Sequence, residues 1–241
     1  MKKKFILLFI LSTIITANIF SIDVNTIIEK YDYNSIFETS KMESSIIVKD
    51  SLGTSNQKIL AYSKRNGDTL IEITEGPDAG QKVLRLSSAI FLYYPEANQI
   101  IRLQGAALKD SFMGSDFSYE DLSGDESIIN NYNATLIDET DSNYIVELNA
   151  KSRKQPYQKE LLIIDKETFV CVEATLMSSS GRELRKMESS DIRKVGDKYV
   201  AFNIKMVDLL KNQGSTTLKI DSLDIDIPLD NNLFTTDNLS W

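Results

Sequence analysis

The side chains that most often carry catalytic chemistry are scarce in this chain of 241 residues. It contains no histidine, which excludes Ser-His-Asp triads, Cys-His pairs and histidine-ligated metal sites. The single cysteine, Cys171, lies within an alternating strand pattern and has no partner for an internal disulfide. We interpret it as a small buried hydrophobic side chain. Any catalysis would therefore have to rest on carboxylates, hydroxyls or lysines.

Two short motifs resemble catalytic loops but lack the required spacing. Gly76 to Lys82 has the glycines and lysine of a phosphate loop, but the spacing is wrong and no Ser or Thr follows the lysine. This segment is interpreted as a turn. Gly53 to Gln57 is not a nucleophile elbow, since that motif needs a second glycine and a histidine elsewhere.

Clustered carboxylates are the remaining candidates for chemistry. The C-terminal group lacks the loop glycine and bidentate glutamate of a calcium site, and part of it alternates with apolar residues as in a half-exposed strand. The group after Tyr119 is interpreted as a solvated helix face rather than an acid/base pair. These two groups are Asp221, Asp224, Asp226 and Asp230, and Glu120, Asp121, Asp125 and Glu126. We therefore predict a protein that is not an enzyme and that has no metal or cofactor.

The amino terminus is typical of an export signal. Lys2, Lys3 and Lys4 precede an apolar stretch over 5–20, which is shorter than a membrane-spanning helix and ends in small polar residues. A retained membrane anchor is the alternative. No cysteine comes directly after this stretch, so a lipid-modified N-terminus is not expected there. We predict a signal peptide over 1–21 and a single soluble domain over 22–241, exported to the periplasm and not integral to a membrane.

The charge of the chain limits its partners. The whole chain has a net charge of −8, and removal of a leader with three lysines and no acid takes this to −11. An acidic chain without a basic patch argues against nucleic acid, and against tight electrostatic docking on anionic lipid.

The elements that must position any site are mostly strands. A helix is expected over 25–43, with Asp23 as its cap, and strand patterns follow from 45–49 to 216–221. Asn66-Gly67 is a strong hairpin signal. Because the links between strands are short and polar, we predict a mainly β fold, an antiparallel meander of about ten to twelve strands that is long enough to curl.

The meander is interrupted once, between Gly105 and Asn133, where a helical or loop insertion is expected. Several strands are apolar on one face only; Tyr144, Val146 and Leu148 share one face, and we predict that the other face is exposed to water. Two short helices are too few to cover a sheet this wide as a second layer would. The sequence leaves open whether the concave face holds a packed core or an apolar cavity under a lid.

One segment in this insertion carries a family resemblance. It follows a Tyr94-Pro95 turn at the usual distance and reads FMGSDFSYEDL, and it resembles the signature of the outer-membrane lipoprotein-sorting (LolA-like) proteins. The eleven residues are Phe112, Met113, Gly114, Ser115, Asp116, Phe117, Ser118, Tyr119, Glu120, Asp121 and Leu122. A Leu233-Phe234 pair after the last strand agrees more loosely. The strand before the motif is usually basic in this family, but here only Arg102 remains, with Lys109 later.

The resemblance implies a half-open antiparallel β-barrel, closed on its apolar concave side by an N-terminal helix and a short helical lid insertion. It also implies a periplasmic carrier that binds the acyl chains of lipoproteins or lipids, with an inner-membrane transporter and an outer-membrane acceptor as partners. The alternative is an adaptor or sensor module that works with an inner-membrane lipid exporter of the resistance-nodulation-division type.

Within this resemblance, individual residues have expected roles. Phe112, Met113, Phe117 and Tyr119 are predicted to form a lid over the cavity, or else to be core that fixes the insertion. Gly114 is expected to permit a close approach, Ser115 or Asp116 to cap the next helix, and Ser118 with Asp121 to form a capping box. The predicted cavity lining consists of Ile90, Leu92, Ile101 and Leu103.

Overall fold

The computed structural model describes residues 22–87, 89–123, 127–211 and 214–240. Across these residues the fold is mainly β, with 54% of the described residues in β structure, and thirteen antiparallel strands form one continuous sheet that is not closed into a barrel. The predicted fold class is confirmed, with one strand more than the upper estimate. The predicted signal peptide over 1–21 lies outside the described residues.

The strands and helices have the following bounds. The first block of strands is β1 (Thr39–Asp50), β2 (Gly53–Lys64), β3 (Thr69–Glu75), β4 (Lys82–Leu86), β5 (Ala89–Tyr94) and β6 (Gln99–Leu103). The second block is β7 (Tyr132–Glu139), β8 (Asn143–Ala150), β9 (Lys159–Asp165), β10 (Cys171–Met177), β11 (Glu183–Val195), β12 (Lys198–Asp208) and β13 (Gly214–Ile225). The helices are α1 (Val24–Ser35), α2 (Tyr119–Ser123) and α3 (Ile128–Asn131), with 3-10 turns η1 (Gly105–Lys109), η2 (Phe112–Gly114), η3 (Asn231–Phe234) and η4 (Asp237–Ser240).

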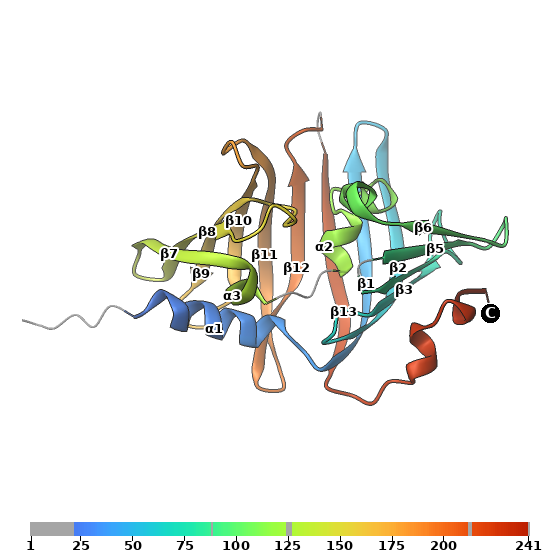
Figure 1. Ribbon diagram of the computed structural model, residues 1–241, viewed down its shortest axis with the longest axis horizontal. Coiled ribbons are helices and arrows are strands. Elements are labelled where there is room, and N and C mark those ends of the chain that lie inside the picture. The colour runs from blue at the N-terminus through green and yellow to red at the C-terminus, as the bar shows by residue number, and fades with distance from the viewer. Residues whose placement is uncertain (1–21, 88, 124–126, 212–213, 241) are drawn as a thin grey trace, which may run out of the picture.

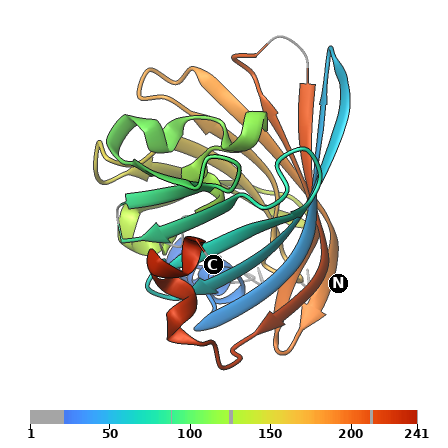
Figure 2. The same ribbon diagram turned by 90° about the vertical axis from the view of Figure 1, so that its right-hand side faces the viewer.

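The strand order explains why the sheet stays open. The two blocks are joined where β1 pairs with β13, so β6 and β7 form the two free edges of the sheet. These edge strands are consecutive strands along the chain, and the insertion between them carries η1, η2, α2 and α3. The sheet curls so that the insertion lies at its open side, as seen in Figures 1 and 2. The topology thus makes the insertion a cover for the concave face.

Helix α1 ends earlier than the sequence pattern indicated. The expected helix over 25–43 stops at Ser35, and Ile36 is already extended. The Lys198 ammonium donates to the carbonyl oxygen of Ile36 at 2.8 Å and also to that of Tyr33, which satisfies carbonyls at the helix end. From Thr39 the chain is held between β2 and β13. Asp23 takes the N-cap position, but its side chain makes no capping bond.

The concave face holds the larger hydrophobic core. Helix α1 contributes Ile27 and Ile28, which are 0% and 1% exposed. Val146 and Leu148 from β8 lie in the same core, on the shared face that the alternation predicted. The described helices include none that is long and apolar enough to cross a lipid bilayer.

The convex face is not uniformly exposed, which corrects the prediction of one apolar and one wet face. Leu70 on β3 and Leu84 on β4 are opposite each other and fully buried beneath the C-terminal segment over 228–240. Phe234 and Leu239 of that segment fill this second core. In Figure 2 the segment, in red, lies against the outside of the sheet. The prediction failed because β3 and β4 are apolar on both faces, and the sequence of these strands does not show which segment covers the convex face.

Candidate functional site

The family motif forms a lid segment, which we define as residues 105–123, lying over the concave face. At its centre the Ser115 amide donates to the Phe112 carbonyl at 2.9 Å, and Met113 and Gly114 between them both have positive φ, 47° and 73°. This is the arrangement of a type I′ turn, which explains the glycine. The prediction that Gly114 permits a close approach was wrong, because a Cβ there would meet nothing within 4 Å.

The turn directs aromatic side chains into the concave core. Phe112 and Phe117 are 1% and 4% exposed and belong to the main core, while Met113 and Tyr119 pack against it and keep part of their surface. Phe112 and Tyr119 contact each other edge to face, with centroids 5.4 Å apart. All four residues are therefore both part of the lid segment and in contact with the core. Their contact with an acyl chain stays a prediction.

The predicted cavity-lining residues share one face of β5 and β6. Ile90 is opposite Leu103 and Leu92 is opposite Ile101, so the register brings the four side chains together. Ile90 and Leu92 are buried in the concave core, Leu103 packs against it, and Ile101 is 39% exposed at the sheet edge. Ile101 also borders a cavity of about 300 Å³. Ligand contact at these residues likewise stays a prediction.

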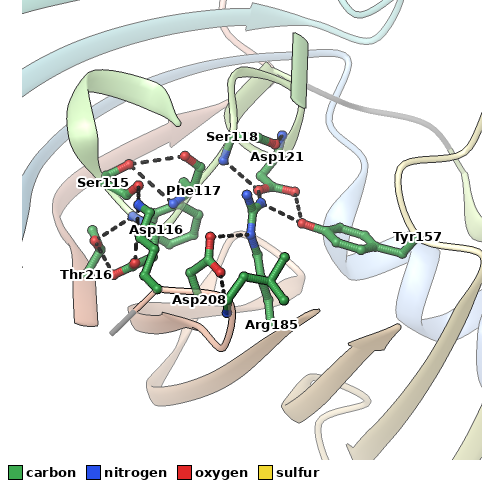
Figure 3. Close-up of polar contacts among 11 residues, drawn as sticks. Ser115, Asp116, Phe117, Ser118, Asp121, Tyr157, Arg185, Asp208 and Thr216 are labelled. Carbon is green, nitrogen blue, oxygen red and sulfur yellow. Dashed lines mark hydrogen bonds and ion pairs between the residues drawn. The ribbon is translucent and has the colours of Figure 1, made fainter. Parts of the chain in front are cut away.

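One end of the lid segment is tied to the sheet by a buried ion-pair cluster (Figure 3). The Asp121 carboxylate pairs with Arg185 on β11 and accepts a hydrogen bond from the Tyr157 hydroxyl at 2.9 Å. Arg185 also donates to the Tyr157 oxygen at 2.6 Å and lies 3.8 Å from a carboxylate oxygen of Asp208. The Arg185 and Asp121 side chains are only 11% and 10% exposed. We call these four residues the arginine latch.

The arginine latch corrects the prediction that Asp121 belongs to a solvated helix face. Burial lowers the pKa of the Arg185 guanidinium, but the neighbouring Asp121 and Tyr157 raise it and the net shift is upward, so the arginine stays charged. Burial, together with Asp121, raises the pKa of the Tyr157 hydroxyl, which therefore stays a hydrogen-bond donor. Of the other acids in that predicted group, Asp125 and Glu126 lie outside the described residues.

A second polar contact ties the motif to β13. The Thr216 hydroxyl donates to an Asp116 carboxylate oxygen at 2.9 Å and accepts from the Asp116 amide at 2.8 Å, with both residues buried. The Lys211 ammonium donates to the Ser115 carbonyl at 2.7 Å and lies 3.5 Å from the Asp116 carboxylate. We call this set the threonine latch. Neither Ser115 nor Asp116 caps α2, contrary to the prediction.

The predicted capping box is confirmed. The Ser118 hydroxyl accepts from the Asp121 amide at 3.1 Å, and the Asp121 carboxylate accepts from the Ser118 amide at 2.7 Å. Asp121 thus connects the start of α2 to the arginine latch.

A glutamate lies on the apolar concave face. Glu160 of β9 is directly opposite Leu148 on β8 and Leu176 on β10, both of which belong to the concave core. Burial raises the pKa of its carboxyl to about 7; a hydrogen bond from Tyr132 acts in the opposite direction and the nearby Asp121 adds to the increase. This side chain keeps part of its surface accessible, so the concave face is not wholly apolar.

Two groups considered for chemistry have structural contacts instead. Cys171 is 3% exposed, which confirms the interpretation as a buried hydrophobic residue, and burial raises the pKa of its thiol to about 12. The C-terminal acids act separately: Asp226 accepts from the Glu38 amide, and Asp230 caps η3. Sequence reasoning missed Tyr157, Glu160, Arg185, Asp208, Lys211 and Thr216, because they lie on strands and loops that are separated in the sequence and meet only in the folded sheet.

Comparison with known proteins supports the family resemblance. A comparison with curated proteins gave no match. Two solved structures superpose with a TM-score of 0.79: a domain from Vibrio parahaemolyticus assigned to the outer membrane lipoprotein-sorting proteins, and a DUF1329 family protein from Desulfovibrio piger. They are 21% and 20% identical, and each alignment covers 90% of this chain and 97% or 98% of the other.

A LolA superfamily protein from Nitrosomonas europaea has a TM-score of 0.76 and 22% identity, covering 90% of this chain and all of that one. At these identities the likeness shows the fold. Residues 65–241 match a family with the description "Uncharacterized protein". The chain therefore belongs to that family. Its fold, as the solved structures show, is that of the LolA-like outer-membrane lipoprotein-sorting proteins.

Proposed function

We propose that this protein is a periplasmic carrier that takes up the acyl chains of lipoproteins or lipids on its concave face and moves them toward the outer membrane. The lid segment is the gate, and Phe112 and Phe117 occupy the site until an acyl chain displaces them. The proposed partners are an inner-membrane transporter and an outer-membrane acceptor. In this proposal the protein binds its cargo without catalysis.

The energetics favour such an exchange. Each methylene buried from water contributes about 0.8 kcal/mol, so a 16-carbon acyl chain gains about 12 kcal/mol when it is enclosed. Moving Phe112 and Phe117 out of the core costs several kcal/mol, since removal of one buried phenylalanine side chain costs about 3–5 kcal/mol. A cargo chain that takes their place offsets this cost through non-directional contacts. Uptake and release would then need no nucleotide.

The observation that carries this proposal is how the lid segment is held. Its apolar side chains insert into the concave core, whereas its ties to the sheet are the arginine and threonine latches at the rim. The apolar side chains of the lid segment can be replaced in the core by another apolar group, such as an acyl chain. The polar latches determine the position to which the lid segment returns when the acyl chain leaves. The LolA-like fold supports the same assignment.

A reversible lock on the lid segment tests the proposal. The side chains of Asp116 and Thr216 are in direct contact, so we choose these two positions for a pair of cysteines intended to form a disulfide. The variant Asp116→Cys/Thr216→Cys, made with Cys171→Ala, should lose lipid transfer between vesicles when oxidised and regain it on reduction. Cys171→Ala alone is the matched control and should transfer lipid under both conditions.

The outcomes separate the candidate functions. Lipid extracted from the purified protein, together with redox-controlled transfer, supports the carrier with its gate. Transfer that persists with the lid segment locked overturns the gate. A protein that carries no lipid, transfers none and instead binds the soluble domain of a transporter is an adaptor, and this result overturns the carrier.

A further inference from the structure

Two adjacent hairpins present exposed leucines at one end of the sheet. Leu52, at the tip of the β1–β2 hairpin, is 94% exposed, and Leu209 and Leu210, which follow β12, are 40% and 53% exposed. Asp50 is opposite Gly214 across β1 and β13, so the two hairpins lie side by side. Figures 1 and 2 show both at the same edge of the molecule. We call these three residues the leucine tip.

The leucine tip is held in a defined conformation. The Asp50 carboxylate accepts from the Leu52 amide at 2.8 Å and from the Gly53 amide at 3.1 Å. In the other hairpin the Asp208 carboxylate accepts from the Leu210 amide at 2.8 Å. Polar turns therefore hold these leucines in water, although burying an apolar side chain would be more favourable. Single exposed apolar residues are common on protein surfaces, whereas exposed apolar residues gathered at one end of a molecule indicate an interaction surface.

The loops around the leucine tip are basic. Leu176 is opposite Arg185, Arg185 is opposite Asp208, and Met177 is opposite Lys159, so the β8–β9, β10–β11 and β12–β13 connections all lie at the same end as the β1–β2 hairpin. Segments 49–53, 151–158, 178–182 and 209–211 hold six basic residues and one acid, in a chain of net charge −8. The six are Lys49, Lys151, Arg153, Lys154, Arg182 and Lys211.

Four of these six charges are available to a partner, since Lys211 pairs with Asp116 and Lys151 donates to the Ile129 carbonyl. All six residues are exposed, and Lys49, Arg153, Lys154 and Arg182 form no ion pair with any described residue. The six come from four separate loops, so no run in the sequence identifies them, and the prediction that the chain lacks a basic patch was wrong. The one acid, Asp50, is engaged by the amides of its own turn.

We propose that this end of the molecule docks on an anionic lipid bilayer, with the leucine tip entering the interface and the basic loops contacting the headgroups. Two contributions bind a protein to such a surface: the burial of apolar side chains in the interface, and the attraction of lysines and arginines to the anionic headgroups. A protein partner could also bury the leucines. The basic residues, however, are spread over four loops, and this distribution matches the extended negative surface of a bilayer better than a single acidic patch on a protein.

The docking end is also where the lid segment is fastened. Lys211, next to Leu210, donates to the Ser115 carbonyl and lies near the Asp116 carboxylate. Leu210, Lys109 and Arg185 border one cavity of about 180 Å³. Docking therefore places the threonine and arginine latches at the membrane. This inference deepens the proposed function, because cargo would then leave or enter beside the bilayer.

Vesicle binding of the cargo-free, mature chain tests the docking. We expect binding to vesicles that mix phosphatidylcholine with phosphatidylglycerol, weakening as salt is raised, and at least about tenfold weaker binding to phosphatidylcholine alone. Leu52→Asp/Leu210→Asp should reduce binding about tenfold or more. The matched control is Ile137→Asp on β7, since Ile137 is 53% exposed away from the leucine tip, and it should bind like the parent.

Charge reversal gives a second measurement that does not depend on the leucines. Arg153→Glu/Lys154→Glu should weaken binding to the anionic vesicles about tenfold or more. The reversal Lys194→Glu, near the opposite end of β11, should leave binding unchanged. Equal binding by tip and control variants, or equal binding to both kinds of vesicle, overturns the docking. Lipid transfer by the parent is measured separately, so failed docking with intact transfer rejects this inference alone, and docking without transfer rejects the carrier alone.

Discussion

The sheet is covered by two different segments, one on each face. The lid segment inserts Phe112 and Phe117 into the concave core, and the C-terminal segment inserts Phe234 and Leu239 against the convex face of β3 and β4. Both covers are short and irregular, and both depend on buried aromatic side chains. They differ in their polar attachments.

The lid segment is attached through buried charges. Arg185 and Asp121 are about one-tenth exposed and the arginine has two carboxylates near it. Among the described residues, the C-terminal segment offers neutral acceptors to two lysines of the sheet: Lys64 donates to the Asn231 side chain at 2.7 Å and lies over the Phe234 ring, and Lys82 donates to the Asn238 carbonyl at 3.2 Å. A buried ion pair adds little net stability but strongly favours one arrangement over a broken one.

This difference indicates different roles for the two covers. A segment that must leave and return to one position benefits from directional, buried polar contacts at its ends. A segment that stays in place needs only apolar burial and weak surface contacts. We therefore expect the C-terminal segment to be a permanent part of the fold and the lid segment to open, and the following substitutions test this contrast.

The largest expected effect comes from truncating one phenylalanine in each cover. Phe112→Ala and Phe234→Ala each remove a buried ring, so each should lower the free energy of unfolding by about 3–5 kcal/mol, measured by urea denaturation. Only Phe112→Ala should change the rate of lipid transfer between vesicles. The contrast fails if both variants change transfer equally after correction for the fraction of folded protein.

The next largest effect concerns Glu160, which lies on the concave face of the sheet, the face that the lid segment covers. Burial raises the pKa of its carboxyl from the ordinary 4.5 to about 7. In the pH window between these two values, the carboxyl is protonated in the folded protein and ionised in the unfolded chain. Stability is therefore greatest below the window and falls as pH rises through it. The shift corresponds to at most about 3 kcal/mol. Tyr31, Tyr132, Cys171 and Asp121 are the ionisable groups that interact with Glu160.

Glu160→Gln should remove this pH dependence. Relative to the parent, the variant should gain up to about 3 kcal/mol above the window and nothing below it, measured by urea denaturation at both pH values. The exposed Glu183→Gln on β11 serves as the control and should follow the parent. Parallel pH profiles for the parent and Glu160→Gln would show that Glu160 is hydrated in the folded protein.

Much of this fold could be predicted from the sequence because its signals are local. Alternation in β8, the Asn66-Gly67 turn and the capping spacing of Ser118 and Asp121 each depend on a few neighbouring residues, and all are confirmed. The helix end was misplaced because Lys198, far along the chain, fixes it. The family motif gave the position of the lid segment.

The latches could not be predicted because they depend on register. Arg185 faces the concave side only through its pairing with Leu176 and Asp208, and nothing within β11 itself distinguishes it from an exposed arginine. Thr216 and Asp116 are one hundred residues apart. The cover of the convex face was missed for the same reason, since Leu70 and Leu84 acquire Phe234 only when the chain end folds back.

The smallest expected effect compares one cap in each cover. Ser118 caps α2 in the lid segment, and Asp230 caps η3 in the C-terminal segment by accepting from the Asn232 amide at 2.9 Å. Ser118→Ala and Asp230→Ala should each cost about 1 kcal/mol or less of unfolding free energy, as expected for the loss of one cap. Ser118→Ala also removes the acceptor of the Asp121 amide at the start of α2, next to the arginine latch, so amide hydrogen exchange should accelerate through residues 111–123. In Asp230→Ala the acceleration should stay within residues 229–235, because no buried charge there depends on the cap. If exchange in the lid segment is unchanged by Ser118→Ala, the capping box does not support the arginine latch, and the latch alone holds that end of the lid.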